Sequence, residues 1–181
     1  MSGHNKWSQI KHKKAAKDQK RSNIFSRLVK EITIAARGEA NPEFNPRLKA
    51  AVLRAKAANM PNDNIERAIK KASESKELEE MTIEAYGPGG IAIIADVITD
   101  NKNRTIPEIK HLLSENNGKL AESGSLDWAF SAKGGSASGG EKLEPKFPQE
   151  IQDKDKERLQ KLLEKLEEND DISTTSHNAK L

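Results

Sequence analysis

The chain has 181 residues, of which 34% are hydrophobic and 33% charged, and it contains no cysteine. Disulfide bonds, thiolate metal sites and cysteine nucleophiles are therefore excluded. No apolar run approaches the roughly 18 residues of a membrane span, and charges stand where a signal peptide needs an apolar segment. We therefore expect a cytoplasmic protein without a membrane partner.

Positive charge is gathered at the amino end of the chain. Residues 1–60 carry 14 Lys and Arg against 4 Asp and Glu, a net charge of +10, whereas residues 61–181 carry 17 against 24, a net charge of −7. Such segregation attracts a polyanion to one end of the molecule and repels it from the other. The partner most simply implied is nucleic acid.

The first element in chain order is a polar basic arm. Residues 2–14 show no apolar periodicity, so the sequence predicts a disordered or extended segment there. Beyond it, Ile24, Leu28 and Ile32 recur at the spacing of one helix face, and Gly38 is expected to end that helix.

Two further helices are expected after the loop that follows Gly38. Asn45 is placed as an N-cap with Pro46 at the first helical position, and Asp63 with Glu66 is interpreted as a capping box. Together with the first helix they form a small three-helix bundle. Residues 1–75 are therefore predicted to be a basic helical nucleic-acid-binding domain with an amino-terminal arm.

The candidate nucleic-acid-binding residues are the basic, histidine and aromatic side chains of the arm and first helix. They are His4, Lys6, Trp7, Lys11, His12, Lys13, Lys14, Lys17, Lys20, Arg21, Arg27 and Lys30. Cations that reach phosphates release counterions and bind in a salt-dependent way. The alternative is a solvated charged face. Trp7 is expected either to stack on an unpaired base or to pack on the bundle.

The hydrophobic period changes beyond residue 80. Met81, Ile83 and Ala85 alternate with polar residues, GPGG at 87–90 predicts a turn, and IAIIADVI reads as a buried strand. A helix is expected after TDNKNRT, ending near Gly118. Leu126, Trp128 and Phe130 alternate in the manner of another strand.

The remaining residues are predicted to complete the sheet. A Gly/Ser linker is expected at 134–140, then a short strand at 143–147, a helix at 153–168 and a last strand at 172–176. The order strand, helix, strand occurs twice, preceded by one hairpin strand, and is typical of a split βαβ or ferredoxin-like sheet. The predicted fold class is α+β, a three-helix bundle followed by a ferredoxin-like antiparallel sheet domain at 80–181.

Catalytic and cofactor sites are not predicted. His4, His12, His111 and His177 lack the i, i+4 pairing of a helical metal site, and GPGG lacks the Lys-Ser/Thr of a phosphate loop. Asp170 and Asp171 are interpreted as an exposed turn entering the last strand rather than as paired catalytic carboxylates. We expect no enzyme, no cofactor and no metal.

Several long segments resemble the YebC/PmpR family closely and in order over nearly the whole chain. They are MSGHNKWSQIKHKKAAKDQKRSNIFSRLVKEITIAAR, NPRLKAAVLRAKAANMPNDNIERAIKKA, YGPGGIAIIADVITDNKNRT and LEENDD. The resemblance implies a helical domain followed by α+β domains. It also implies either transcriptional regulation by DNA binding or a translation factor that acts on the ribosome through rRNA.

One departure from the family pattern concerns the Gly/Ser linker. Family members usually carry a further small α+β domain at this point, so a function that needs three domains is not implied for this chain.

Two classes of function remain open from the sequence. The first is a nucleic-acid-binding regulator of gene expression. Base-edge reading of DNA is weakly supported because the third helix lacks a Gln/Asn/Arg cluster, and RNA asks only for an arm, positive surfaces and an aromatic. The second is a protein-interaction module that uses the acidic α+β domain, with the basic arm auxiliary.

Overall fold

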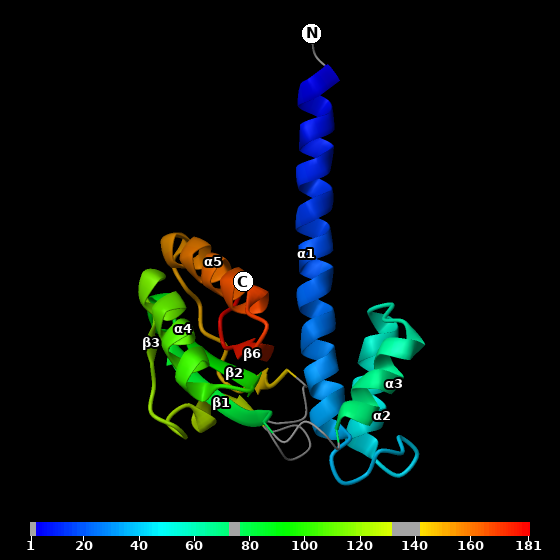
Figure 1. Ribbon diagram of the computed structural model, residues 1–181. Helices are drawn as coiled ribbons and strands as arrows, with labels where there is room; N and C mark the ends of the chain where they lie inside the picture. The colour runs from blue at the N-terminus through cyan, green and yellow to red at the C-terminus, as the bar shows by residue number, and fades with distance from the viewer. Residues whose placement is uncertain (1–2, 73–76, 132–141) are drawn as a thin grey trace.

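The computed structural model describes residues 3–72, 77–131 and 142–181. Three helices form its amino-terminal part: α1 (Gly3–Ala35), α2 (Pro46–Ala57) and α3 (Asn62–Lys71). An α/β part with an antiparallel sheet follows (Figure 1). The predicted class, α+β with helices first and an antiparallel sheet second, is confirmed.

The amino-terminal arm is helical, so the prediction of a disordered or extended segment is wrong from Gly3 onward. α1 runs without interruption for 33 residues. Between His4 and Arg37 the sequence contains neither Gly nor Pro and is rich in Lys, Ala, Gln and Arg. These are strong helix formers, and their propensity needs no apolar stripe. Periodicity alone therefore missed this half of the helix.

The bundle core is made by the faces that the sequence predicted. Leu28 and Ile32 of α1 pack with Leu48 of α2 and Ile65 of α3 in one buried cluster. Asn45 caps α2 as predicted, because its side chain accepts a hydrogen bond from the Leu48 backbone N–H at 3.0 Å.

The capping box predicted for the third helix is absent. α3 begins at Asn62 with Pro61 in the N-cap position, and no side chain caps it. The backbone carbonyl of Pro61 accepts from the N–H groups of Asn64 and Ile65 instead. Asp63 consequently lies inside the first turn of α3, where its negative charge interacts favourably with the positive end of the helix dipole. It does not form a capping box.

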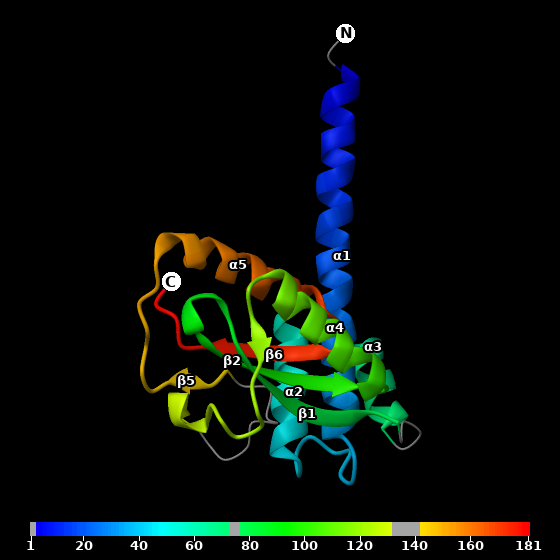
Figure 2. The ribbon, with the colours of Figure 1, turned by 90° about the vertical axis from the view of Figure 1, so that its left-hand side faces the viewer.

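The α/β part holds a four-stranded sheet with two helices on one face (Figure 2). Its order is β3-β1-β2-β6, with every neighbouring pair antiparallel. The strands are β1 (Glu79–Tyr86), β2 (Ala92–Thr99), β3 (Lys119–Leu120) and β6 (Ile172–His177), and the helices are α4 (Lys102–Glu115) and α5 (Asp153–Glu168). Leu113, Leu159 and Leu162 from the two helices share a buried core with Ile93 and Val97 of β2.

The turn between β1 and β2 is the 3-10 segment η1 (Pro88–Gly90). Gly89 and Gly90 have φ angles of 70° and 74°. Because L side chains rarely adopt this left-handed region, the two glycines are required by the turn itself.

The predicted strand over Leu126, Trp128 and Phe130 is wrong. Residues Asp127–Ala129 form the 3-10 turn η2, and only Phe130–Ser131 is extended, as β4. Leu126 and Phe130 are both buried and four residues apart, a spacing that one helical turn satisfies. The alternation was therefore a false period, and Trp128 is 52% exposed.

Because of this difference, the predicted strand at 126–130 does not complete the split βαβ sheet. β4 pairs with β5 (Glu144–Pro145) in a separate two-stranded sheet. The position between β2 and β3 is filled by β1, the hairpin strand that precedes the first βαβ unit. The predicted linker at 134–140 lies outside the described residues.

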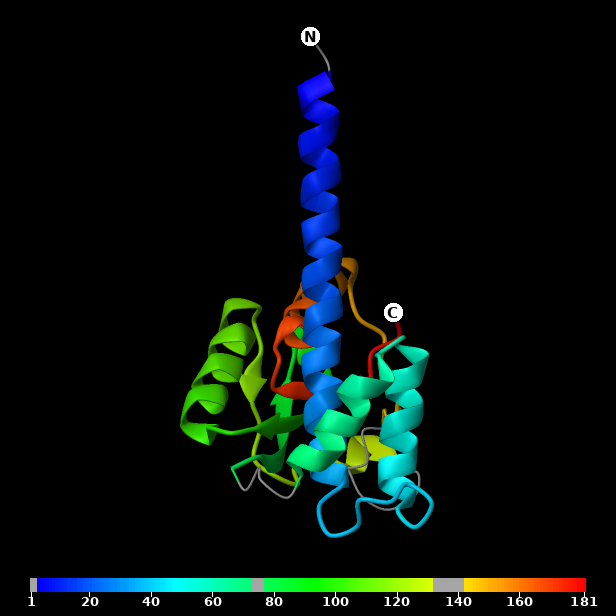
Figure 3. The same cartoon turned by 45° about the vertical axis from the view of Figure 1, so that its right-hand side comes forward.

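Helix α1 joins the two parts of the molecule. One side of its carboxyl-terminal half packs on α2 and α3, and another side contacts β2 and β6 (Figure 3). Its amino-terminal half extends beyond both parts.

Candidate nucleic-acid interface

The amino-terminal half of α1 stands clear of the other described elements in all three views (Figures 1, 2 and 3). Among the described residues, the hydrogen bond from α1 to the α/β part nearest to this half is made by Asn23, whose side chain donates to the Glu168 carbonyl at 3.0 Å. Residues 3–20 therefore project by roughly 25 Å at 1.5 Å per residue. We call this segment, extended to Arg21, the projecting half of α1.

Five predicted site residues have exposed side chains on the projecting half: Lys11, Lys14, Lys17, Lys20 and Arg21. Within the described part of the chain none of the five forms an ion pair. Arg21 lies over the ring of Phe25, 5.1 Å from its centroid, which fixes one cation against the helix. The predicted residues His4, Lys6, Trp7, His12 and Lys13 belong to the same helix.

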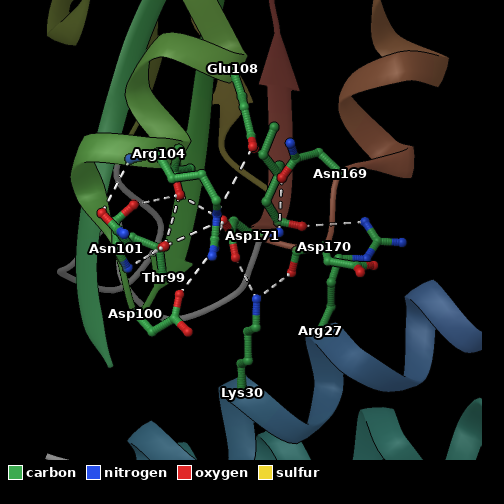
Figure 4. Close-up of polar contacts among 12 residues, drawn as sticks. Arg27, Lys30, Thr99, Asp100, Asn101, Arg104, Glu108, Asn169, Asp170 and Asp171 are labelled. Atoms are coloured by element: carbon green, nitrogen blue, oxygen red, sulfur yellow. Dashed lines mark hydrogen bonds and ion pairs between the residues drawn. The ribbon is translucent and has the colours of Figure 1, made fainter. Parts of the chain in front are cut away.

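Arg27 and Lys30 are not brought together with the other predicted site residues. They lie on the side of α1 that faces β6, and the protein's own acceptors engage them (Figure 4). Arg27 donates to the Ile172 carbonyl at 3.4 Å, and Lys30 donates to the Asp170 carbonyl at 3.0 Å. The Lys30 ammonium also pairs with Asp171 at 2.5 Å. These two cations hold the two parts of the molecule together.

Asp171 is the centre of that attachment. Its side chain is 5% exposed, and it accepts from Arg104 at 2.8 Å and from the Thr105 hydroxyl at 2.6 Å (Figure 4). Burial alone would raise the pKa of Asp171, but the hydrogen bonds from Lys30, Thr105 and Arg104 outweigh it and lower the pKa to about 2. The sequence placed this residue correctly before the last strand and wrongly in an exposed turn.

A second acidic group lies on β2, on the side of the sheet near α1. Asp96 is buried, and burial raises its pKa to about 6, against the hydrogen bonds that Thr174 and Thr82 donate to it. The negative charges of Glu80 and of Glu31 on α1 act in the same direction as burial.

Glu31 belongs to the same electrostatic neighbourhood. It is buried, and burial raises its pKa, although the Arg54 guanidinium at 3.1 Å opposes the shift. Arg47 of α2 pairs with Glu80 of β1 across the two parts. The interface between bundle and sheet is therefore polar and densely charged, not a continuous apolar core.

We call the rest of α1, residues 22–35, its packed half. A small cleft against α5 lies at the border between the projecting half and the packed half. Lys20, Asn23, Ile24 and Arg27 line one wall, and the acidic side chains Glu164, Glu167 and Glu168 line the other, around a volume of about 100 Å³. These three carboxylates were missed as functional candidates. Their i, i+3 and i+4 spacing indicates that they lie close together at the end of a helix. The sequence does not indicate that this cluster lies beside α1, which depends on the tertiary fold.

The described residues contain no group of three or more His, Asp and Glu side chains that could hold a metal ion. Among the described helices, none combines the length and the apolarity that crossing a membrane requires.

These features define a two-part α+β protein in which the projecting half of one helix carries five exposed cations. Two family models match the chain: the TACO1/YebC protein N-terminal domain over residues 5–75, and the TACO1/YebC second and third domain over residues 78–144. The chain belongs to the TACO1/YebC family.

Individual relatives agree with that assignment. A "Probable transcriptional regulatory protein" of Petrotoga mobilis is 59% identical, and one of Fervidobacterium nodosum is 56% identical, each over 74% of this chain and 55% of the relative. The chain thus spans about half the length of the curated relatives it matches. A solved structure, a conserved hypothetical protein of Aquifex aeolicus, is 32% identical, with a TM-score of 0.78 and coverage of 88% of this chain and 90% of that one.

Proposed function

We propose that the chain is a nucleic-acid-binding regulator of gene expression that grasps its target with the projecting half of α1. The observation that carries the proposal is the set of five exposed cations on the half of α1 that extends beyond the other described elements. Residues 1–75 would form the binding domain, and residues 80–181 the α+β domain that positions it. The proposed action is binding, not catalysis.

The charge distribution supports this function physically. A helix of high positive charge that extends away from an acidic body attracts a polyanion more strongly along its length than the body does. Each Lys or Arg that reaches a phosphate releases counterions and adds salt-sensitive affinity. The relatives named as transcriptional regulators support a role in transcription, and a role in translation through rRNA uses the same electrostatics.

A second candidate function is a protein-interaction module centred on the α+β part. It is favoured by one observation: Trp128 and Phe147 are 52% and 59% exposed and lie together, with ring centroids 6.1 Å apart. Exposed aromatic pairs are common anchors of protein interfaces. In that case the basic helix is auxiliary.

The test compares two matched triple variants of the full chain. Lys14→Gln, Lys17→Gln and Arg21→Gln removes three charges from the projecting half, and Lys110→Gln, Lys154→Gln and Lys161→Gln removes three exposed charges from α4 and α5. Fluorescence anisotropy with a labelled DNA duplex measures the affinity of each variant between about 50 and 200 mM salt.

The α1 variant is expected to bind at least roughly 10-fold more weakly and to lower the slope of log affinity against log salt by about 2–3. The α4/α5 variant is expected to bind as the unmodified chain does. Equal losses in both variants would show that net charge, not the helix, drives binding. No loss in either would leave the protein-interaction function as the better account.

A further inference from the structure

The projecting half of α1 has the dimensions of a groove-binding helix. An α-helix with its side chains is about 10–12 Å across. The major groove of B-form DNA is about 12 Å wide and admits one, whereas the major groove of A-form RNA is too deep and narrow for side chains to read. Because the arm is a helix and not an extended segment, its shape distinguishes between these targets.

The exposed cations occupy one half of the helix circumference. Lys11 and Lys20 are nine residues apart, which is about 2.5 turns at 3.6 residues per turn, so they lie on opposite flanks of the helix. Lys14, Lys17 and Arg21 fall between those flanks, at i, i+3 and i+7. A helix bound in a groove contacts phosphates on both flanks and base edges along its centre. The positions of the five cations around α1 fit this geometry.

The remaining charges limit how far a duplex can extend along α1. Asp18 lies between Lys11 and Lys14 around the helix, so one carboxylate accompanies the five cations. At Lys20, which lines the cleft against α5, the acidic wall of Glu164, Glu167 and Glu168 begins. Phosphates are therefore attracted along the projecting half and repelled at the body of the protein.

We propose that the projecting half of α1 lies in the major groove of a B-form DNA duplex, with Lys11 and Lys20 on the phosphates of its two walls and Lys14, Lys17 and Arg21 toward the base edges. This inference rests on the proposed function, because it specifies the target of the same helix. It predicts that binding depends on helical shape as well as on charge.

The deciding variant changes shape without changing charge. Ala15 is exposed and lies outside the basic half of the circumference. Ala15→Pro breaks the helix there, since proline removes a backbone donor and clashes with the preceding turn. Ala15→Gln is the matched control, because glutamine is a good helix former and also lengthens the side chain.

Affinity is measured for one sequence prepared as duplex DNA, duplex RNA and single-stranded DNA. We expect Ala15→Pro to weaken duplex DNA binding at least roughly 10-fold and single-strand binding less than 2-fold, and Ala15→Gln to change neither. The unmodified chain should prefer duplex DNA to duplex RNA. Asp18→Asn should strengthen duplex DNA binding, because it removes a carboxylate from the groove-facing side.

Two results would overturn the inference and spare the proposed function. They are equal affinity for duplex DNA and duplex RNA, and unchanged duplex DNA binding by Ala15→Pro while the Lys14/Lys17/Arg21 variant is weakened. Either would mean that α1 acts as a flexible polycation or reads RNA. If the Lys14/Lys17/Arg21 variant binds normally, the inference and the proposed function both fail.

Discussion

The two halves of α1 carry the same kinds of side chain and use them differently. Lys17 and Lys30 are both lysines of one helix, yet Lys17 is exposed and Lys30 is held by Asp171 and the Asp170 carbonyl. The difference comes entirely from what lies opposite. Basic residues on a helix become a binding surface only where the fold leaves them without an acidic partner of its own.

The packed half can be broken at Asp171, and this change has the largest expected effect. Asp171→Ala removes the acceptor shared by Lys30, Arg104 and Thr105 and leaves two cations near each other. Breaking such a partly buried network costs roughly 2–4 kcal/mol, or roughly 5–15 °C in melting temperature for a chain of this size. Thermal unfolding followed by circular dichroism measures it.

The same variant should leave the projecting half intact. Nucleic-acid affinity, measured well below the melting temperature, is expected to stay within about 2-fold, because the exposed lysines do not touch Asp171. Lys30→Met serves as the partial control, since it removes one donor and keeps the apolar stem. A large loss of affinity in Asp171→Ala would show that the two halves do not act separately.

Acid should weaken the packed half through the same residue. The pKa of Asp171 is lowered to about 2 in the folded protein, so its stabilising contribution is present above the unfolded value near 4 and is lost as pH falls toward 2. The melting temperatures of the unmodified chain and of Asp171→Ala should therefore converge between about pH 4 and pH 2. Parallel pH profiles would contradict this assignment.

Asp96 differs from Asp171 because its ionised form destabilises the folded protein, whereas the ionised form of Asp171 stabilises it. Its folded pKa is raised to about 6, so stability from the protonated form is complete below the unfolded pKa and is lost as pH rises through 6. Asp96→Asn is expected to raise the melting temperature by roughly 2–6 °C at pH 8 and hardly at all at pH 4. Asp18→Asn, on the projecting half, should leave the melting temperature nearly unchanged at both pH values.

An equal gain by Asp96→Asn at pH 4 and pH 8 would contradict the prediction. It would mean that the amide improves packing or hydrogen bonding with Thr82 and Thr174 and that removal of a buried charge is not the cause.

Local signals were sufficient for most of the fold. The periodic leucines Leu159, Leu162 and Leu166 define α5, and the predicted range of 153–168 is the observed one. Asn45 followed by Pro46 marks the start of α2 without tertiary information. The failures have different causes: the arm is helical by propensity without an apolar stripe, and Leu126 to Phe130 gave a false alternation over one turn.

The candidate site could be predicted only in outline. Charge counts located it on the amino end, but Lys30 and Arg27 could not be separated from Lys14 and Lys17, because their partners are 140 or more residues away in sequence. Asp171 was expected to be exposed for the same reason. Pairing across the fold is a tertiary property, and neither spacing nor composition records it.

The smallest expected effect lies at the border between the halves, where α5 faces α1. Glu164→Gln, Glu167→Gln and Glu168→Gln together remove three negative charges from the wall opposite Lys20 and Arg27. Repulsion of an approaching polyanion should fall, and nucleic-acid affinity should rise by roughly 2- to 5-fold at low salt. Because these groups are exposed and act over distances near the Debye length, the gain should vanish by about 1 M salt.

The control for this triple variant removes three exposed carboxylates that do not line the cleft, through Glu43→Gln, Glu122→Gln and Asp127→Asn. Both variants change the net charge equally, so a gain confined to the α5 variant assigns the effect to the border of the projecting half. An equal gain in affinity by both variants would mean that net charge alone causes the effect. A loss in the α5 variant alone would mean that these carboxylates hold α1 in its binding orientation, and the separation of the two halves at Lys20 would then be wrong.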